Sequence, residues 1–196
     1  MTQDAQQIER DVQAAVEAEP ARIAERVHAI TLAALTRGLV DTQALREVTQ
    51  AVLRGAQAAA PRVEAGRTEG LKEAVRGLDE ALASAAQATQ LAMQEAIGRS
   101  SEFSREGLKQ SLDQLSRLEG DFVAALGDAA RQASGTAQAT LKDLVEHARS
   151  SGTAVGARVQ SAVVDLGQAM GDLARAQVQE GMRALSAQAE LLASMA

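Results

Sequence analysis

The sequence lacks cysteine, tryptophan and tyrosine, and it contains only two phenylalanines and two prolines among its 196 residues. Without cysteine the chain has no disulfide, no thiolate metal ligand and no cysteine nucleophile. β-Sandwiches and β-barrels build their strands and turns largely from aromatic, β-branched, proline and glycine residues. The scarcity of aromatics and proline therefore argues against both of these folds.

The sequence is rich instead in residues that favour helices. It contains 43 alanines and 19 glutamines, and its remaining residues include many Leu, Glu and Arg, all of them good helix formers. We therefore expect an all-α protein. The formal net charge is −6, whereas a nucleic-acid-binding protein normally carries a basic surface. We therefore expect no nucleic-acid partner.

The N-terminus and the apolar runs bear on the protein's location. The first residues show no basic segment followed by an apolar one, as a secretory signal would. The longest stretch of low charge, residues 81–94, is shorter than the roughly 18–20 apolar residues that span a bilayer. The sequence predicts no integral membrane segment and a cytoplasmic protein.

The two prolines divide the chain into two parts. In residues 1–60, apolar residues at spacings of three and four predict three short helices, with Pro20 in the first turn of the second and Pro61 after the third. Residues 61–196 contain no further proline beyond Pro61, and they predict three long helices over 62–98, 101–150 and 153–195. The breaks near 98–101 and 150–153 are either turns or kinks.

Apolar residues repeat along these long helices in the manner of helices that pack side by side. Many of the seam positions themselves are alanine, which allows close approach of the helix axes. We expect a small N-terminal three-helix unit followed by a coiled-coil-like bundle of about three long antiparallel helices. The predicted core seam contains Leu71, Leu78, Leu108, Leu115, Phe122 and Leu126.

The C-terminal helix carries the lowest charge density of the three. Residues 151–196 hold four acidic and three basic side chains, whereas residues 101–150 hold eight and six. A helix with so few charges is usually covered by neighbours or presented to a surface. The sequence therefore predicts an interface at Leu166, Gly167, Met170, Gly171 and Leu173.

Residues that carry chemistry are few. His28 and His147 lie on different predicted helices, and packing roles are favoured over a metal site completed by Glu25 or Asp143. The serines cluster at predicted helix ends, where hydroxyl groups act as caps. Neither a P-loop nor a dinucleotide-binding glycine motif occurs. We expect no enzyme activity, no catalytic residue, no metal and no cofactor.

Three segments of the chain resemble an uncharacterised proteobacterial all-helical family, known only as a domain of unknown function. The segments are residues 71–82 (LKEAVRGLDEAL), 102–109 (EFSREGLK) and 146–156 (EHARSSGTAVG). The resemblance covers most of the chain and weakens in the C-terminal third. Because the family is uncharacterised, the resemblance gives no information about an activity or a cofactor. The overall texture is also loosely similar to phasins, the helical proteins that coat storage granules.

These observations lead to two hypotheses about function. The first is a non-catalytic interaction or scaffold protein that forms homo-oligomers through its Ala/Leu-rich seams, because long thin helices leave lateral surface for a partner to cover. The alternative is a phasin-like or apolipoprotein-like coat, in which amphipathic helices lie on a lipid or storage-granule surface. The missing aromatic anchors and the scarcity of lysine on the polar faces disfavour this alternative.

Overall fold

The computed structural model describes residues 3–36, 42–59, 64–98 and 105–194. In chain order its elements are α1 (Gln3–Ala18), the short 3-10 helix η1 (Pro20–Arg22), α2 (Ile23–Leu35), α3 (Thr42–Ala58), α4 (Glu64–Gly98), α5 (Arg105–Gln132), α6 (Gly135–Ser151) and α7 (Ala154–Ser194). Within these ranges the chain forms no strand. The prediction of an all-α protein is confirmed.

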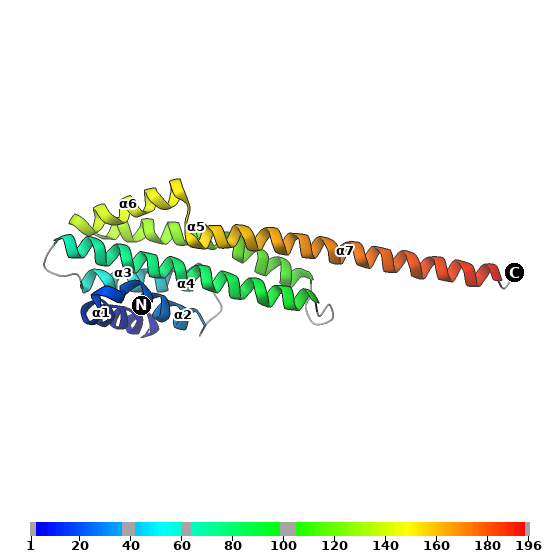
Figure 1. Ribbon diagram of the computed structural model, residues 1–196, viewed down its shortest axis with the longest axis horizontal. Helices are drawn as coiled ribbons and strands as arrows, with labels where there is room; N and C mark the ends of the chain where they lie inside the picture. Colours follow the sequence, from blue (N-terminus) through cyan, green and yellow to red (C-terminus); the bar gives the residue numbers. More distant parts are fainter. Residues whose placement is uncertain (1–2, 37–41, 60–63, 99–104, 195–196) are drawn as a thin grey trace.

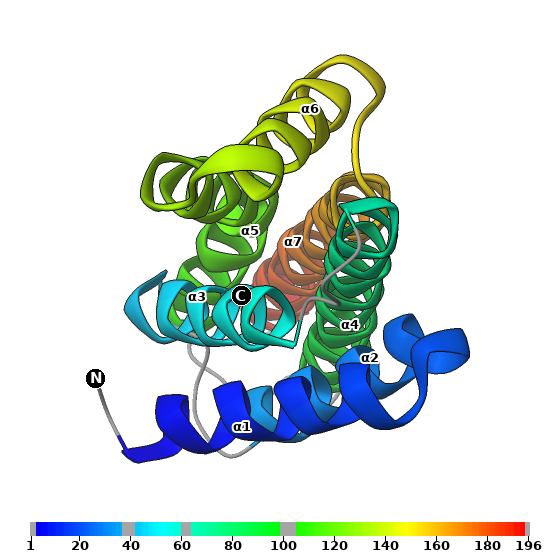
Figure 2. The ribbon, with the colours of Figure 1, turned by 90° about the vertical axis from the view of Figure 1, so that its left-hand side faces the viewer.

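The long helices α4, α5 and α7 form the body of the molecule (Figure 1). α5 runs back along α4, α6 folds back along α5, and α7 runs in the same direction as α4. The shorter helices α1, α2 and α3 pack against one end of this body, which Figure 2 shows end-on. The long-helix bundle thus has both antiparallel and parallel neighbours.

Two contacts fix the parallel register of α4 and α7. The carboxylate of Asp79 on α4 accepts a hydrogen bond of 2.8 Å from the backbone N–H of Ala154, 75 residues later. Further along both helices, the Gln90 side-chain amide donates to Asp165 at 2.9 Å, again across 75 residues. The two helices therefore advance together, residue for residue.

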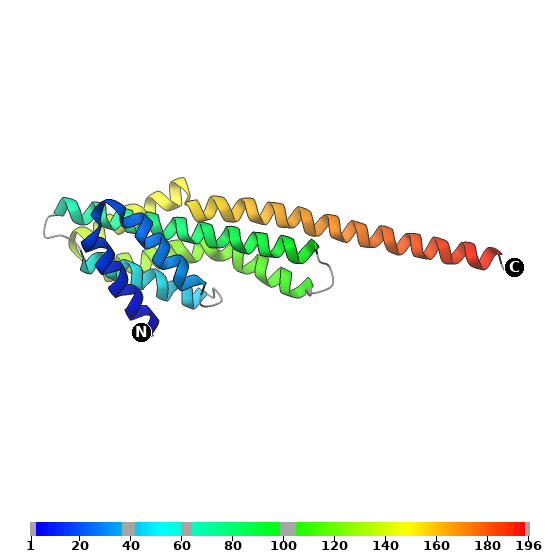
Figure 3. The ribbon, with the colours of Figure 1, turned by 60° about the horizontal axis from the view of Figure 1, so that its bottom comes forward.

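The same register places the end of α4, at Gly98, level with residue 173 of α7. α7 continues to Ser194, so about 20 residues pass the end of α4, a length of roughly 30 Å. Figures 1 and 3 show this segment projecting alone from the body of the molecule. We call residues 174–194 the overhang.

A single buried core connects all seven α-helices. It includes one almost fully buried side chain from each: Val12, Val27, Leu45, Leu78, Phe122, Leu141 and Leu166. The predicted seam residues Leu71, Leu78, Leu108, Leu115, Phe122 and Leu126 all lie in this core. The N-terminal helices and the long helices therefore share their apolar interior.

Two glycines permit the closest approaches of the N-terminal helices to their neighbours. A Cβ atom on Gly77 of α4 would lie 2.2 Å from the backbone oxygen of Ala24 on α2. A Cβ on Gly55 of α3 would lie 2.4 Å from the backbone oxygen of Glu9 on α1. Beside Gly55, Arg54 donates to the Glu9 carboxylate at 3.0 Å. At both places only glycine fits the observed backbone separation.

The expected helix over 101–150 is in fact two helices, which corrects the sequence prediction. α5 ends at Gln132 and α6 begins at Gly135, whose φ of 58° lies in the left-handed region. Residues with side chains adopt this region reluctantly, so Gly135 allows the chain to reverse there. The apolar spacing continues through the reversal, and for this reason periodicity alone did not indicate it.

The predicted break near 150–153 is a turn. α6 ends at Ser151, and Gly152, with a φ of 79°, donates its N–H to the backbone oxygen of Ala148 before α7 begins at Ala154. The other predicted break, near 98–101, lies largely outside the described residues, as does Pro61. α4 ends at Gly98, just before the predicted break at 98–101.

Candidate interaction surface

The start of α7 is held by side chains from two other helices. A helix leaves its first N–H groups without backbone partners, and capping groups normally satisfy them. Here the Asp79 carboxylate of α4 accepts from Ala154 at 2.8 Å and from Val155 at 2.9 Å. Thr153 Oγ1 accepts from Gly156 at 2.9 Å. These bonds fix the position and direction in which α7 leaves the turn.

Glu119 of α5 completes this anchor from the other side. The Thr153 hydroxyl, besides accepting from Gly156, donates to Glu119 Oε1 at 2.9 Å. The carboxylate lies so close to α7 that a Cβ on Gly156 would stand 1.9 Å from Glu119 Oε1. α7 is therefore tied to α4 through Asp79 and to α5 through Glu119.

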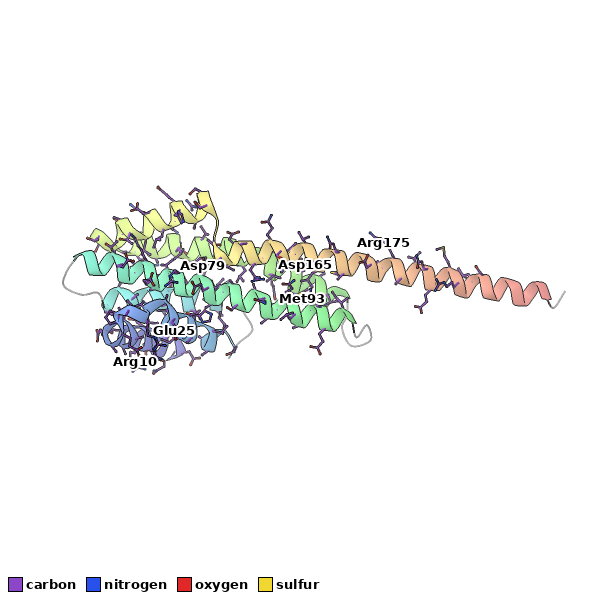
Figure 4. All side chains as sticks on the ribbon, in the orientation of Figure 1. Arg10, Glu25, Asp79, Met93, Asp165 and Arg175 are labelled. Atoms are coloured by element: carbon purple, nitrogen blue, oxygen red, sulfur yellow. The ribbon has the colours of Figure 1, made fainter. Side chains whose placement is uncertain are left out.

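Burial raises the pKa of Asp79 above its ordinary value. The hydrogen bonds from Val155 and Ala154 lower the pKa, and the nearby Glu119 and Glu80 raise it again. Figure 4 shows Asp79 beside the start of α7, where this carboxyl group meets the helix end. The two acidic side chains at this junction are structural anchors of α7.

One face of α7 is used inside the chain. Val155, Val159, Ala162 and Leu166, spaced by three and four residues, are buried against the neighbouring helices. Residues at this spacing share one side of a helix. We call this the bundle face.

A second apolar face of α7 is exposed, with no neighbour among the residues that the structure describes. Val164, Val178, Met182 and Leu185 are 53%, 61%, 57% and 67% exposed, although all four are large and apolar. At 100° per residue they lie within about 40° of Val178, and Gly167, Gly171 and Ala174 lie in the same sector. We call this set the outward stripe: Val164, Gly167, Gly171, Ala174, Val178, Met182 and Leu185.

The outward stripe is open to approach along its length. A Cβ atom added to Gly167 or to Gly171 would meet nothing within 4 Å. The stripe begins beside the bundle at Val164 and continues along the overhang, where Figure 4 shows Arg175 near the point at which α4 ends. Apolar side chains in such a continuous row favour a partner surface over water.

The structure separates the interface residues that the sequence grouped together, and this corrects the prediction. Leu166 is 0% exposed and belongs to the bundle face, so no partner reaches it. Gly167 is exposed, and Met170 and Gly171 are half-buried. The side chain of Leu173 lies outside the described part of the structure. Of this group, Gly167 and Gly171 belong to the outward stripe.

A signal for the second face was present in the sequence. One row of apolar residues in α7 runs from Val155 to Leu173 at steps of three or four, and the next large apolar residue after Leu173 is Val178, five residues on. A step of five turns a helix by about 140° beyond one full turn, so it leads from one face to another. Reading all apolar residues as a single row concealed this change of face.

Some titratable side chains elsewhere have partners within the chain. His28 on α2 lies 3.2 Å from the Ser84 hydroxyl of α4, whereas His147 is exposed on α6. Arg76 bonds to both Glu73 and Glu80 along α4. Among the described residues, no group of three His, Asp or Glu side chains is arranged to hold a metal ion.

A groove of about 500 Å³ lies between α1, α2 and α3. Its walls are mainly apolar and include Ile8, Ile30 and Val48, while Asp4 and Asp11 stand among its polar lining residues. The Asp11 carboxylate already accepts a hydrogen bond from Gln7 at 2.7 Å. The lining contains three carboxylates, Asp4, Asp11 and Glu47, but no histidine, lysine or hydroxyl-bearing side chain.

Comparison with known protein families identifies the family of this chain. The chain belongs to the Family of unknown function (DUF6781), which matches residues 1–196. No curated protein and no solved structure matches it. In the described part of the chain, every helix is too short or too polar to cross a bilayer.

Proposed function

We propose that this DUF6781 member is a non-catalytic scaffold protein that self-associates through its helices. The observation that carries the proposal is the outward stripe of α7, with four large apolar side chains more than half exposed in one row. Exposed apolar rows of this kind are typical of protein or membrane contact sites. α7 is firmly anchored at its start, so it presents this row as a fixed surface.

The surroundings of the titratable groups support the non-catalytic part of the proposal. Among the described residues, carboxylates with shifted pKa values include Glu19 and Glu25, whose pKa is lowered by hydrogen bonds from Arg26 and Arg22, and Asp79, whose pKa is raised by burial. Glu19 and Glu25 form exposed pairs with Arg26 and Arg22, and Asp79 caps a helix. Each of these groups therefore has a structural role, and none faces a nucleophile across a cavity.

Light scattering of the purified full chain over a range of concentrations tests the proposal. Self-association predicts a mass above 20.4 kDa that falls on dilution as the assembly dissociates. A single species of monomer mass at every concentration would contradict it.

A coat on a lipid or storage-granule surface is the second candidate, favoured by the same exposed row on a projecting helix. Stable binding of an amphipathic helix at a membrane usually adds basic residues and aromatic anchors to its apolar face. α7 contains no lysine and no aromatic residue. Flotation with vesicles of phosphatidylcholine and anionic lipid distinguishes the two candidates. A coat protein binds the vesicles as a monomer and floats with them, whereas a scaffold protein does not.

A further inference from the structure

We infer that the outward stripe of α7 binds the outward stripe of α7 in a second copy of this chain, in the antiparallel direction. The two-fold axis of the pair lies between Ala174 and Arg175. This inference rests on the proposed self-association and names its surface, direction and register. Three properties of α7 support it: the order of large and small residues, the length of the helix and the position of its charges.

The first property is the order of residues along the stripe. With the axis between Ala174 and Arg175, Val178 of one copy is level with Gly171 of the other, and Met182 is level with Gly167. Leu185 is likewise level with Val164. Each large side chain of the overhang thus meets a glycine or a valine beside the partner's bundle, and both glycines are open to approach. A glycine opposite a large side chain lets two helices pack closely.

A parallel pair lacks this match. In that arrangement each residue faces its own copy, so Gly167 and Gly171 face glycines and leave gaps. Val178, Met182 and Leu185 face equally large side chains and hold the helices apart. Gaps forfeit packing contacts, and the helices cannot close them without bringing the large residues into conflict.

The second property is length. α7 has 41 residues, from Ala154 to Ser194, and residue 174 is its midpoint. A two-fold axis close to this point makes the two helices overlap from end to end, over roughly 60 Å. The overhang of each copy then covers the part of the partner's stripe that begins at Val164. The overhang is therefore long enough to cover the partner's exposed row and ends where the partner's α7 begins.

The third property is charge. Asp172 and Arg175 flank the stripe on the same side, are 74% and 79% exposed at their side chains, and bond to each other at 2.9 Å. In an antiparallel pair the same flanks of both helices face each other. Arg175 of one copy then comes within about 3 Å, along the axis, of Asp172 of the other. Such exposed pairs select orientation more than they add affinity.

Cysteine cross-linking in the full chain tests the register, because the native sequence has no cysteine. Ala174→Cys is expected to form disulfide-linked dimers on oxidation, since the two residues meet at the axis. Val164→Cys and Leu185→Cys are each expected to form none alone, because the equivalent residues lie about 30 Å apart. An equal mixture of these two variants is expected to form dimers.

A parallel pair gives the opposite pattern, in which every single variant cross-links with itself, and this result would overturn the inference. Oligomers in light scattering with no cross-link in any of these samples would also overturn it, but would leave self-association standing. A chain that stays monomeric would refute both. Flotation of the monomer with vesicles would assign the stripe to a lipid surface instead.

Val178→Glu, with Ala176→Glu as its matched control, tests the same surface without cysteine. Both residues are exposed, and both changes add one negative charge to α7. Val178 lies on the stripe, whereas Ala176 points about 160° away from it. We expect Val178→Glu to weaken self-association tenfold or more, because it buries a charge in the pair, and Ala176→Glu to leave it unchanged. Equal effects of the two changes would contradict the proposed face.

Discussion

Gly77 and Gly120 are both helical glycines, yet their surroundings give them opposite roles. Gly77 stands against the backbone of α2, and a Cβ there would lie 2.2 Å from an oxygen that cannot move by itself. Gly120 on α5 is exposed, and a Cβ there would meet nothing within 4 Å. Glycine destabilises a helix because it loses more conformational entropy on folding than other residues do. Only at Gly77 does the close packing against α2 compensate for this cost.

We therefore expect Gly77→Ala to destabilise the fold by about 1–3 kcal/mol, because α2 and α4 must move apart. Gly120→Ala is the control and should stabilise by about 0.5–1 kcal/mol, since alanine favours the helix. Urea unfolding followed by circular dichroism measures both changes. A destabilisation of the same size in both variants would show that the contact with α2 is not the cause.

The anchor of α7 gives a prediction about pH. Burial raises the pKa of Asp79, so the folded chain holds this proton more tightly than the unfolded chain does. The stabilisation from this group is then complete below the unfolded pKa and is lost as pH rises through the folded pKa. Asp79→Asn removes the titration and should abolish this contribution at every pH.

The free energy of unfolding of both proteins, measured between pH 3 and pH 7, isolates this group. We expect the stability of the native chain relative to Asp79→Asn to decline as pH rises above the ordinary aspartate pKa of about 3.9. A difference that grows with pH would mean that the hydrogen bonds to Ala154 and Val155 outweigh burial.

At the scale of helices, local sequence patterns predict which residues form helices and which of them are buried. The spacing of Leu71, Leu78 and Phe122 predicts that they lie in the core, as the structure shows, because apolar periodicity indicates which side of a helix is covered. The reversal at Gly135 was not predicted, since a single glycine within a helical pattern is ambiguous. The parallel register of α4 and α7 depends on contacts across 75 residues, which no local pattern contains.

The candidate surface shows the same limit. The interface predicted from the sequence combines residues of two faces of α7: Leu166, which is buried, and Gly167 and Gly171, which lie on the outward stripe. Periodicity identifies apolar rows, but it does not say which row the rest of the chain covers. That distinction required the positions of α4 and α5.

The two faces of α7 predict different responses to truncation of their side chains. Leu166→Ala should destabilise the monomer by about 2–5 kcal/mol, because it leaves a cavity in the core. Val164→Ala, at a position that is 53% exposed, should change the same quantity by less than about 0.5 kcal/mol. Thermal and urea unfolding at low protein concentration measure both. A large effect at Val164 in the monomer would show that the chain itself covers the outward stripe.

For the whole molecule, we expect the overhang to contribute to self-association but little to the stability of the monomer. Leu166 is the last buried apolar residue in the described part of α7, and the described side chains from Ala174 onward are exposed. A chain ending at Ala176 should therefore keep the unfolding midpoint of the full chain to within a few degrees at low concentration, yet lose self-association. Calorimetry and light scattering make the two measurements.

A shorter chain, ending at Val163, is the control for this truncation. It lacks Leu166 and the Asp165 contact with Gln90, so its unfolding midpoint should fall clearly. If the chain ending at Ala176 loses as much stability as this control, the overhang contributes to the fold of the monomer.

The 75-residue separation between α4 and α7 also has a consequence for the order of folding. A ribosome completes α4 long before it adds the residues that bind Asp79 and Gln90. Contacts between segments so distant in sequence form late, because the intervening chain must first be ordered. We therefore expect closure of α7 onto α4 to be a late step of folding. Until α7 closes, we expect newly made chains to expose the apolar side of α4 alongside the stripe of α7 and to aggregate more readily than the finished molecule.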